Sequence, residues 1–272
     1  MNTCILFLAA MLLSSCTAAI EKNYTASTPA NAAVKTFLGI PLSDSVDFIR
    51  WKLKLSDNGF ALWCNYGIGK PNTNGFHNGG KTVELTGSLT KQKNIFHLQS
   101  SNKTLKITEL NADLLHILNA DNSLMTGNGG WSYTLNNTKP VITEEINLAP
   151  EQIHLPDSMI FEGRSPCAVA GFGSKNCYKL KWYIVLYADK SANRPATYKM
   201  LTSTWRQDGG KKGKWEIAKG KNNRTIYQLY DDKGHLFLQL LKPDENILLF
   251  IDADGKPLVG DEDFSYTLSK TL

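Results

Sequence analysis

The sequence has few of the side-chain patterns from which catalytic and metal centres are usually built. Its 272 residues include five histidines, which are scattered and show no His/Glu spacing suited to zinc. It contains no Gly-x-Ser-x-Gly motif, and no Ser/His/Asp arrangement can be placed in it. We therefore expect a protein that is not an enzyme and that carries no cofactor and no metal.

Long hydrophobic runs and helical periodicity are also scarce. No segment, the apolar run of residues 5–13 included, is both apolar and long enough to span a membrane. A short turn around residues 149–152 is the one helical signal. The formal net charge of +5 is spread along the chain, and its densest cluster, residues 209–214, is typical of a solvated turn. A nucleic-acid partner is accordingly not expected.

The first sixteen residues resemble a bacterial lipoprotein signal peptide. An apolar run from Ile5 to Leu13 is too short to cross a bilayer but suits the core of a signal peptide. Small residues precede Cys16, which a lipoprotein signal peptidase would leave as the acylated N-terminus. No Lys or Arg precedes the run, and an ordinary cleaved signal or a buried apolar start is the alternative. We expect a signal peptide over residues 1–16 and a palmitate-bearing anchor at Cys16, in the outer membrane of a Gram-negative bacterium.

The remaining chain is long enough for two domains. Residues 17–36 are small and polar, which is typical of a tether. Residues 138–158 contain three prolines and are typical of a linker. These boundaries predict a first domain over residues 37–137 and a second over residues 159–272.

The two expected domains repeat each other. The segment Leu114–Leu135 aligns without a gap with Ile247–Leu268, at an offset of 133 residues, and both segments end in an aromatic residue followed by Ser-Tyr-Thr-Leu. Further upstream, Trp51 matches Trp182 at an offset of 131 residues. A shared order of motifs at nearly constant spacing indicates a duplication.

Each copy is a series of short β-strand signals. Apolar and polar residues alternate in Trp51–Leu55, and turn formers such as Asp57–Gly59 and Asp231–Gly234 separate the signals. Short strands at a spacing of roughly ten residues predict an antiparallel barrel or a curled meander. The expected fold is all-β, with two tandem small antiparallel β-barrels of lipocalin-like or meander type.

The second copy resembles the NlpE-like copper-homeostasis and envelope-stress lipoproteins. The likeness rests on the Gly-x-Trp strand Gly213–Ile217, on the leucine-rich strand with its Asp-x-Asp-Gly turn and Tyr-x-Leu ending, and on the segment Gly163–Cys167. The resemblance implies a small lipocalin-like barrel and a role in copper handling. The sequence departs from the family's Cys-x-x-Cys motif, because Ala, Val and Ala follow Cys167.

The cysteines of the second copy are Cys167 and Cys177. They stand ten residues apart in a chain that we expect to be exported, where oxidising conditions favour disulfides. We predict a bridge between them; a copper(I) thiolate pair with Met200 nearby, and two free thiols, are the alternatives. Cys64 stands alone and is expected to be a small buried hydrophobe, with a reactive thiol or a metal ligand as the alternative.

Two aromatic pairs mark the ends of the copies. Trp131 with Tyr133, and Phe264 with Tyr266, fall at the period of a strand, so each pair is expected to face one side of it. Closure of the barrel core is the expected role, and the lining of a ligand cavity is the alternative.

Two classes of function agree with these features. The first is a non-enzymatic lipoprotein of the cell envelope that acts as a binding or stress-sensing module. It is attached to the membrane through its lipid anchor, and its partner is a protein of the envelope. The second is a lipocalin-like carrier of a small apolar ligand or of copper inside one barrel.

Overall fold

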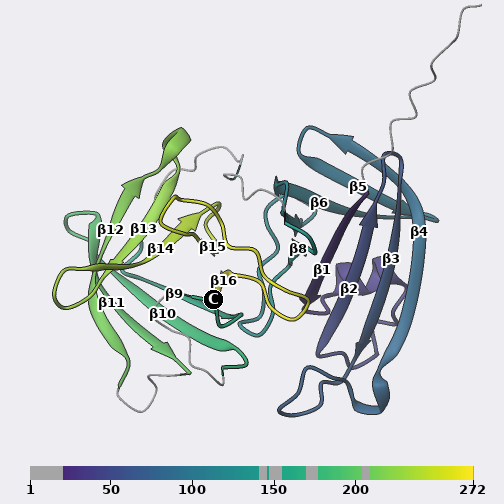
Figure 1. Cartoon of the computed structure of the whole chain (residues 1–272), viewed down its shortest axis with the longest axis horizontal. Coiled ribbons are helices and arrows are strands. Elements are labelled where there is room, and N and C mark those ends of the chain that lie inside the picture. The colour runs from purple at the N-terminus through teal and green to yellow at the C-terminus, as the bar shows by residue number, and fades with distance from the viewer. Residues whose placement is uncertain (1–20, 141–145, 147–154, 170–176, 204–208, 272) are drawn as a thin grey trace, which may run out of the picture.

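The computed structural model describes residues 21–140, 146, 155–169, 177–203 and 209–271. Over these residues the chain is all-β and forms two closed antiparallel barrels, as Figure 1 shows. The sequence-based prediction of two tandem antiparallel barrels is therefore confirmed. No helix among the described residues is long and apolar enough to cross a membrane.

The two barrels have the same topology. In each one every strand pairs with the next, and the eighth strand closes on the first. The strands of the first barrel are β1 (Lys22–Thr28), β2 (Phe48–Leu55), β3 (Gly59–Gly67), β4 (Lys81–Gln92), β5 (Ile95–Ser100), β6 (Lys103–Asn111), β7 (Leu114–Ile117) and β8 (Thr134–Asn137). Those of the second are β9 (Ser158–Ser165), β10 (Leu180–Asp189), β11 (Arg194–Thr202), β12 (Lys211–Lys219), β13 (Thr225–Tyr230), β14 (Leu236–Lys242), β15 (Ile247–Phe250) and β16 (Thr267–Lys270). Two short 3-10 turns, His77–Gly79 and Lys221–Asn223, lie in connections.

The first barrel begins earlier than the sequence indicates. Residues 22–36, which were expected to belong to a tether, form β1 and most of a helix, α1 (Ala32–Leu38). β1 lies between β2 and β8, and these two strands bury most of its small and polar residues. Much of the expected linker, including the turn expected at 149–152, lies outside the described residues, and β9 begins at Ser158.

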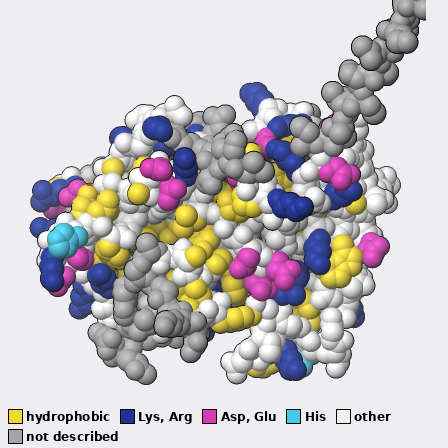
Figure 2. Space-filling model, viewed as in Figure 1, with side chains coloured by type: hydrophobic (Ala, Val, Ile, Leu, Met, Phe, Trp, Pro, Cys, Tyr) yellow, Lys and Arg dark blue, Asp and Glu magenta, His cyan; other side chains and the backbone are white. Residues whose placement is uncertain are grey.

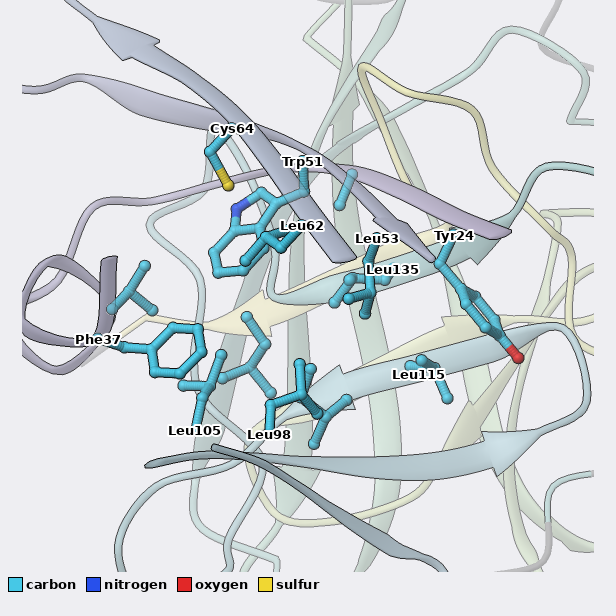
Figure 3. Packing of buried hydrophobic residues seen from close by; sticks show 14 of the residues in the cluster. Tyr24, Phe37, Trp51, Leu53, Leu62, Cys64, Leu98, Leu105, Leu115 and Leu135 are labelled. Atoms are coloured by element: carbon cyan, nitrogen blue, oxygen red, sulfur yellow. The ribbon is translucent and has the colours of Figure 1, made fainter. Parts of the chain in front are cut away.

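Helix α1 was not expected from the sequence. Its N-terminus is capped by the Asn31 side chain, which accepts a hydrogen bond from the Val34 backbone N–H. Gly39 ends the helix in the left-handed conformation at φ 71°, where glycine has no steric penalty. Val34 and Phe37 are buried, and in Figure 3 Phe37 points toward the leucines of the barrel interior. The helix thus contributes to the core of the first barrel.

Large side chains fill both barrel interiors. Alternate residues of β2 and β3 point inward in the first barrel, and Figure 3 shows Trp51, Leu62 and Cys64 converging with residues from other strands. Cys64 is fully buried there, and burial raises the pKa of its thiol. The second core has a similar composition; its largest fully buried side chains are Trp215, Tyr198, Tyr227, Phe161 and Phe250.

The same hydrogen-bonded motif holds a tryptophan in each core. The indole N–H of Trp51 donates to Thr28 Oγ1 at 2.8 Å, and Thr28 in turn donates to the carbonyl of the proline that follows it. In the second barrel the indole of Trp182 donates to Ser165 Oγ at 2.8 Å, and Ser165 likewise donates to the next proline. The duplication has therefore preserved a polar contact as well as the strand order.

The barrels meet along an inter-barrel seam that contains both polar and apolar contacts. Ser132 and Ser265 approach to 2.6 Å between their hydroxyl oxygens, and Arg50 of the first barrel pairs with Asp263 of the second at 2.6 Å. One apolar cluster draws buried side chains from both barrels: Leu110, Leu114, Leu118, Leu124, Ile226, Leu241, Ile247, Leu249 and Ile251. The cluster continues the packing of each barrel across the seam.

Candidate functional site

The wall of the second barrel is open between β11 and β12. These strands pair at four positions only, from Thr197 opposite Lys214 to Met200 opposite Lys211. The corresponding strands of the first barrel, β3 and β4, pair at eight positions. No backbone pairing therefore joins residues 194–196 of β11 to residues 215–219 of β12. The two strands separate there.

An indole bridges this opening. Trp215 follows the last paired position of β12, and its Nε1–H donates to the Tyr187 carbonyl of β10 at 2.8 Å. β10 has a bulge between Leu186 and Ala188, next to that carbonyl. Trp215 also meets Tyr227 edge-on at 4.9 Å between ring centroids. The side chain thus supports strands on both sides of the opening.

A hollow of about 1020 Å³ lies over the paired part of these strands and beside the β13–β14 turn. We call it the β11–β12 hollow; its lining is Tyr187, Thr197, Tyr198, Lys199, Lys212, Gly213, Lys214, Glu216, Tyr230, Asp231, Asp232, Lys233 and Gly234. A second hollow of about 680 Å³ adjoins it along the opening and shares Thr197, Lys214 and Glu216 with it. The first is large enough for a small organic molecule.

Lysines dominate the strands of the hollow. Lys199 of β11 stands directly opposite Lys212 of β12, and Lys214 lies two residues along the same face. Among the described residues none of the three forms an ion pair. In Figure 2, Lys and Arg side chains stand among Asp and Glu side chains at the left-hand end of the molecule, over the part of the second barrel that Figure 1 labels β11 to β14.

A buried tyrosine lies behind the hollow, on the inner face of β11. Tyr198 is 1% exposed, yet its hydroxyl has no hydrogen-bond partner among the described residues. Burial raises its pKa, with a smaller contribution from the negative charges of Asp231 and Asp232, so the hydroxyl is neutral and able to donate. A Cβ placed on Gly213 would lie 3.1 Å from this hydroxyl and 2.0 Å from the Tyr230 carbonyl. Glycine is therefore needed where β12 passes Tyr230.

Of the three acidic residues that line the hollow, Asp231 is hydrogen-bonded within the β13–β14 turn. Asp231 Oδ1 accepts the backbone N–H groups of Lys233 and His235, which hold the β13–β14 turn, and these bonds lower the pKa of the carboxyl. Its Oδ2 lies 3.4 Å from His235 Nδ1. Glu216 and Asp232 are exposed and form no ion pair within the described residues. Asp231 therefore serves the turn more than the hollow.

The two cysteines of the second copy are joined. Cys167 and Cys177 form a disulfide, with their Cα atoms 5.9 Å apart, in the connection between β9 and β10. Met200 is fully buried in the second core, and no group of three or more His, Cys, Asp or Glu residues suited to a metal is found within the described residues. A bridged pair offers no thiolate to copper. Cys16 lies outside the described residues.

The four aromatic residues at the ends of the copies divide into two kinds. Tyr133 and Tyr266 belong to the first and second cores respectively. Trp131 instead stacks on Phe48 at 4.6 Å between centroids, with the Arg164 guanidinium of the second barrel 4.9 Å from its ring. Phe264 meets Tyr178 edge-on at 6.4 Å. None of the four belongs to the lining of the β11–β12 hollow.

Sequence reasoning did not find the hollow. The cluster at residues 209–214, interpreted as a solvated turn, is a turn only at Gly209 and Gly210, and Lys211 already begins β12. The alternation of Lys212 and Lys214 before a buried Trp215 is the signal of a strand with a basic outer face. Known proteins add no further guide, since no protein-family model, no curated protein and no solved structure matches the chain.

Proposed function

We propose that the chain is a non-enzymatic lipoprotein of the bacterial cell envelope that binds a small ligand in the β11–β12 hollow. The observation that carries the binding role is a hollow of about 1020 Å³ on the barrel wall, lined by Lys199, Lys212 and Lys214, which form no ion pair within the described residues. A concave surface on which several polar groups converge is where small molecules usually bind.

The envelope location rests on the N-terminal sequence. The apolar run that ends in Leu-Ser-Ser-Cys supports export and acylation at Cys16. The bridge between Cys167 and Cys177 agrees with an oxidising compartment, where such bonds persist. The likeness of the second copy to the NlpE-like lipoproteins supports the same compartment, while the bridged cysteines speak against that family's copper role for this chain.

A carrier with its ligand enclosed inside a barrel is the weaker candidate. Trp51 and Tyr24 occupy the first interior, and Trp215, Tyr198 and Phe161 occupy the second, all almost fully buried. An apolar ligand in either interior would have to displace these side chains, because protein cores are close-packed. The open hollow on the barrel wall requires no such displacement.

The proposal is tested by blocking the hollow in the full chain. Thr197 is exposed on β11 within the hollow, so Thr197→Trp would fill part of it. The matched control is Thr90→Trp, at an exposed position of β4 in the first barrel. Protein released from membranes in mild detergent is examined by native mass spectrometry. We expect a bound small molecule on the wild type and on the control, and its loss from Thr197→Trp; retention of the molecule by Thr197→Trp would contradict the assignment of the hollow.

A further inference from the structure

We propose that the β11–β12 hollow takes an organic anion, whose phosphate or carboxylate group binds Lys199, Lys212 and Lys214. This inference rests on the proposed binding role of the hollow and adds the chemical class of the ligand. It is carried by the arrangement of charges on neighbouring strands.

The first step is the pairing of like charges. Lys199 and Lys212 are direct cross-strand partners in β11 and β12, and like charges in that position destabilise a sheet. Lys214 lies on the same face as Lys212, because side chains alternate along a strand. Three ammonium groups therefore share one small area of the barrel wall, and none of them has an acidic partner within the described chain.

The second step is the balance of charge around the whole hollow. Its lining holds four lysines, with Lys233 as the fourth, against the carboxylates of Glu216, Asp231 and Asp232. Asp231 is engaged by two backbone N–H groups and by His235. Glu216 stands opposite Gln228 of β13, one position beyond Lys214 on the outer face. The lysine end of the hollow is therefore positive, as an anion site requires.

The third step is the size and polarity of the remaining lining. A bare phosphate or carboxylate would occupy only a small part of about 1020 Å³. The side chains of Tyr187 and Tyr230, which also line the hollow, offer flat apolar surface. Tyr187 is 40% exposed, so its ring is accessible to a ligand. These features fit a ligand with an anionic group at one end and a larger organic part.

The experiment compares two triple variants of the full chain. Lys199→Gln, Lys212→Gln and Lys214→Gln together remove the three charges of the hollow. The matched control, Lys70→Gln, Lys93→Gln and Lys103→Gln, removes three exposed lysines of the first barrel that form no ion pair within the described residues. The net charge of the two variants is the same, so a general loss of attraction for anions affects both equally.

Binding is measured by calorimetry with glucose 1-phosphate, pyrophosphate and citrate, and by flotation with vesicles of phosphatidylglycerol or phosphatidylcholine. We expect at least one anionic probe to bind, and the hollow variant to bind it about tenfold more weakly or worse, while the control stays within about twofold of the wild type. Binding of a free anion identifies a soluble source, and binding restricted to phosphatidylglycerol vesicles identifies a lipid headgroup.

A thermal melt gives an independent readout. Because the three lysines repel each other when no anion is bound, the hollow variant should melt at a higher temperature than the wild type in low salt, and the difference should shrink as salt is added. The inference is overturned if no anionic probe binds, or if both variants bind equally. A neutral molecule bound to the wild type but absent from Thr197→Trp would overturn it too, while leaving the proposed binding role intact.

Discussion

The hydroxyl oxygens of Thr134 and Thr267 lie 2.9 Å apart, although the two residues occupy the same position in the two copies of the repeat. Ser132 and Ser265, also equivalent, make the same kind of self-contact at 2.6 Å. Equivalent residues can meet in this way only when a twofold axis passes close to them. The seam between the barrels is thus a pseudo-symmetric interface.

Reciprocal contacts across the seam support the same symmetry. The Gly127 backbone N–H donates to Ser269 Oγ at 2.9 Å, and the Gly260 backbone N–H donates to Asn136 Oδ1 at 2.9 Å. Gly260 is the counterpart of Gly127 and Ser269 that of Asn136 in the aligned repeat. Such an exchange is the pattern of an isologous dimer, so the linked barrels are arranged like two subunits of a homodimer.

The seam predicts that the barrels stay together without the linker. A protease site placed within residues 147–152 and cut after folding should yield two fragments that co-elute in size-exclusion chromatography, because polar contacts and a buried apolar cluster join the barrels. The same cleaved protein carrying Leu249→Asp should separate into fragments, since an unpaired carboxylate would be buried in that cluster. Fragments that part on cleavage of the wild type would show that the seam is held only by the covalent connection.

The burial of His116 predicts that the folded protein loses stability in acid. It is fully buried at the seam, where its Nε2 lies 2.9 Å from the Met125 carbonyl and its Nδ1 lies 2.9 Å from Thr134 Oγ1. Burial lowers its pKa from the ordinary 6.5 to about 4. The unfolded chain therefore takes up the proton first as the pH falls. Stability should be unaffected above pH 6.5 and should decline below it, toward pH 4, by about 1.4 kcal/mol per pH unit.

The measurement is urea unfolding at several pH values between these limits. The variant is His116→Leu, because leucine occupies the equivalent position, Leu249, in the second copy. It should reduce the acid dependence, whereas the matched variant of an exposed histidine, His77→Asn, should retain it. Equal slopes in all three proteins would exclude His116 as the source.

The tryptophan motif predicts that removing the acceptor of the indole N–H lowers the stability of the protein by a similar amount in either barrel. Thr28→Val removes the acceptor of the Trp51 indole while keeping the side-chain shape, and Ser165→Ala does the same for Trp182. Each should lower the free energy of unfolding by about 1–3 kcal/mol, because a buried N–H is left without its partner. Urea denaturation followed by tryptophan fluorescence measures both, and exposed Thr90→Val serves as a control that should change little.

The disulfide predicts a stability difference that depends on the redox state. Cys167→Ser with Cys177→Ser removes the bridge between two positions ten residues apart, which should lower the free energy of unfolding by on the order of 2–3 kcal/mol in the chain-entropy account. Reduction of the wild type should give a similar loss in urea denaturation. Copper(I) competition titration of the unreduced wild type should show no tight stoichiometric site; a stoichiometric complex abolished by Cys167→Ser would contradict this and revive the copper role.

Lipid attachment at Cys16 predicts that a variant without this cysteine is no longer a processed protein of the membrane fraction. Cys16→Ala should leave the precursor unprocessed or release the protein in soluble form, because the acylated residue is gone. Membrane fractionation with radiolabelled palmitate measures both effects. A variant that still partitions with membranes and takes up palmitate would remove the basis for the anchor.

The fold could be predicted mainly because the duplication shows each strand pattern twice. β1 was missed since residues 22–28 are small and polar, and only pairing with β2 and β8 buries Tyr24 and Ala26. Helix α1 is seven residues long, too short for a clear period, although its cap Asn31 and its terminal Gly39 were present in the sequence. The hollow depends on where the β11–β12 ladder stops, which is decided by pairing between strands rather than by either strand alone.

The start of β1 at Lys22 limits how far an anchored molecule could reach. With a lipid on Cys16, only residues 17–21 would separate the acylated residue from the first barrel. Five residues span at most about 18 Å when fully extended, so the first barrel would stay close to the headgroups of its own bilayer. A partner attached to the opposite membrane of the envelope would itself have to extend across the space between the two membranes. Lipids and diffusible molecules at the surface of the anchoring bilayer would be close enough to contact the protein.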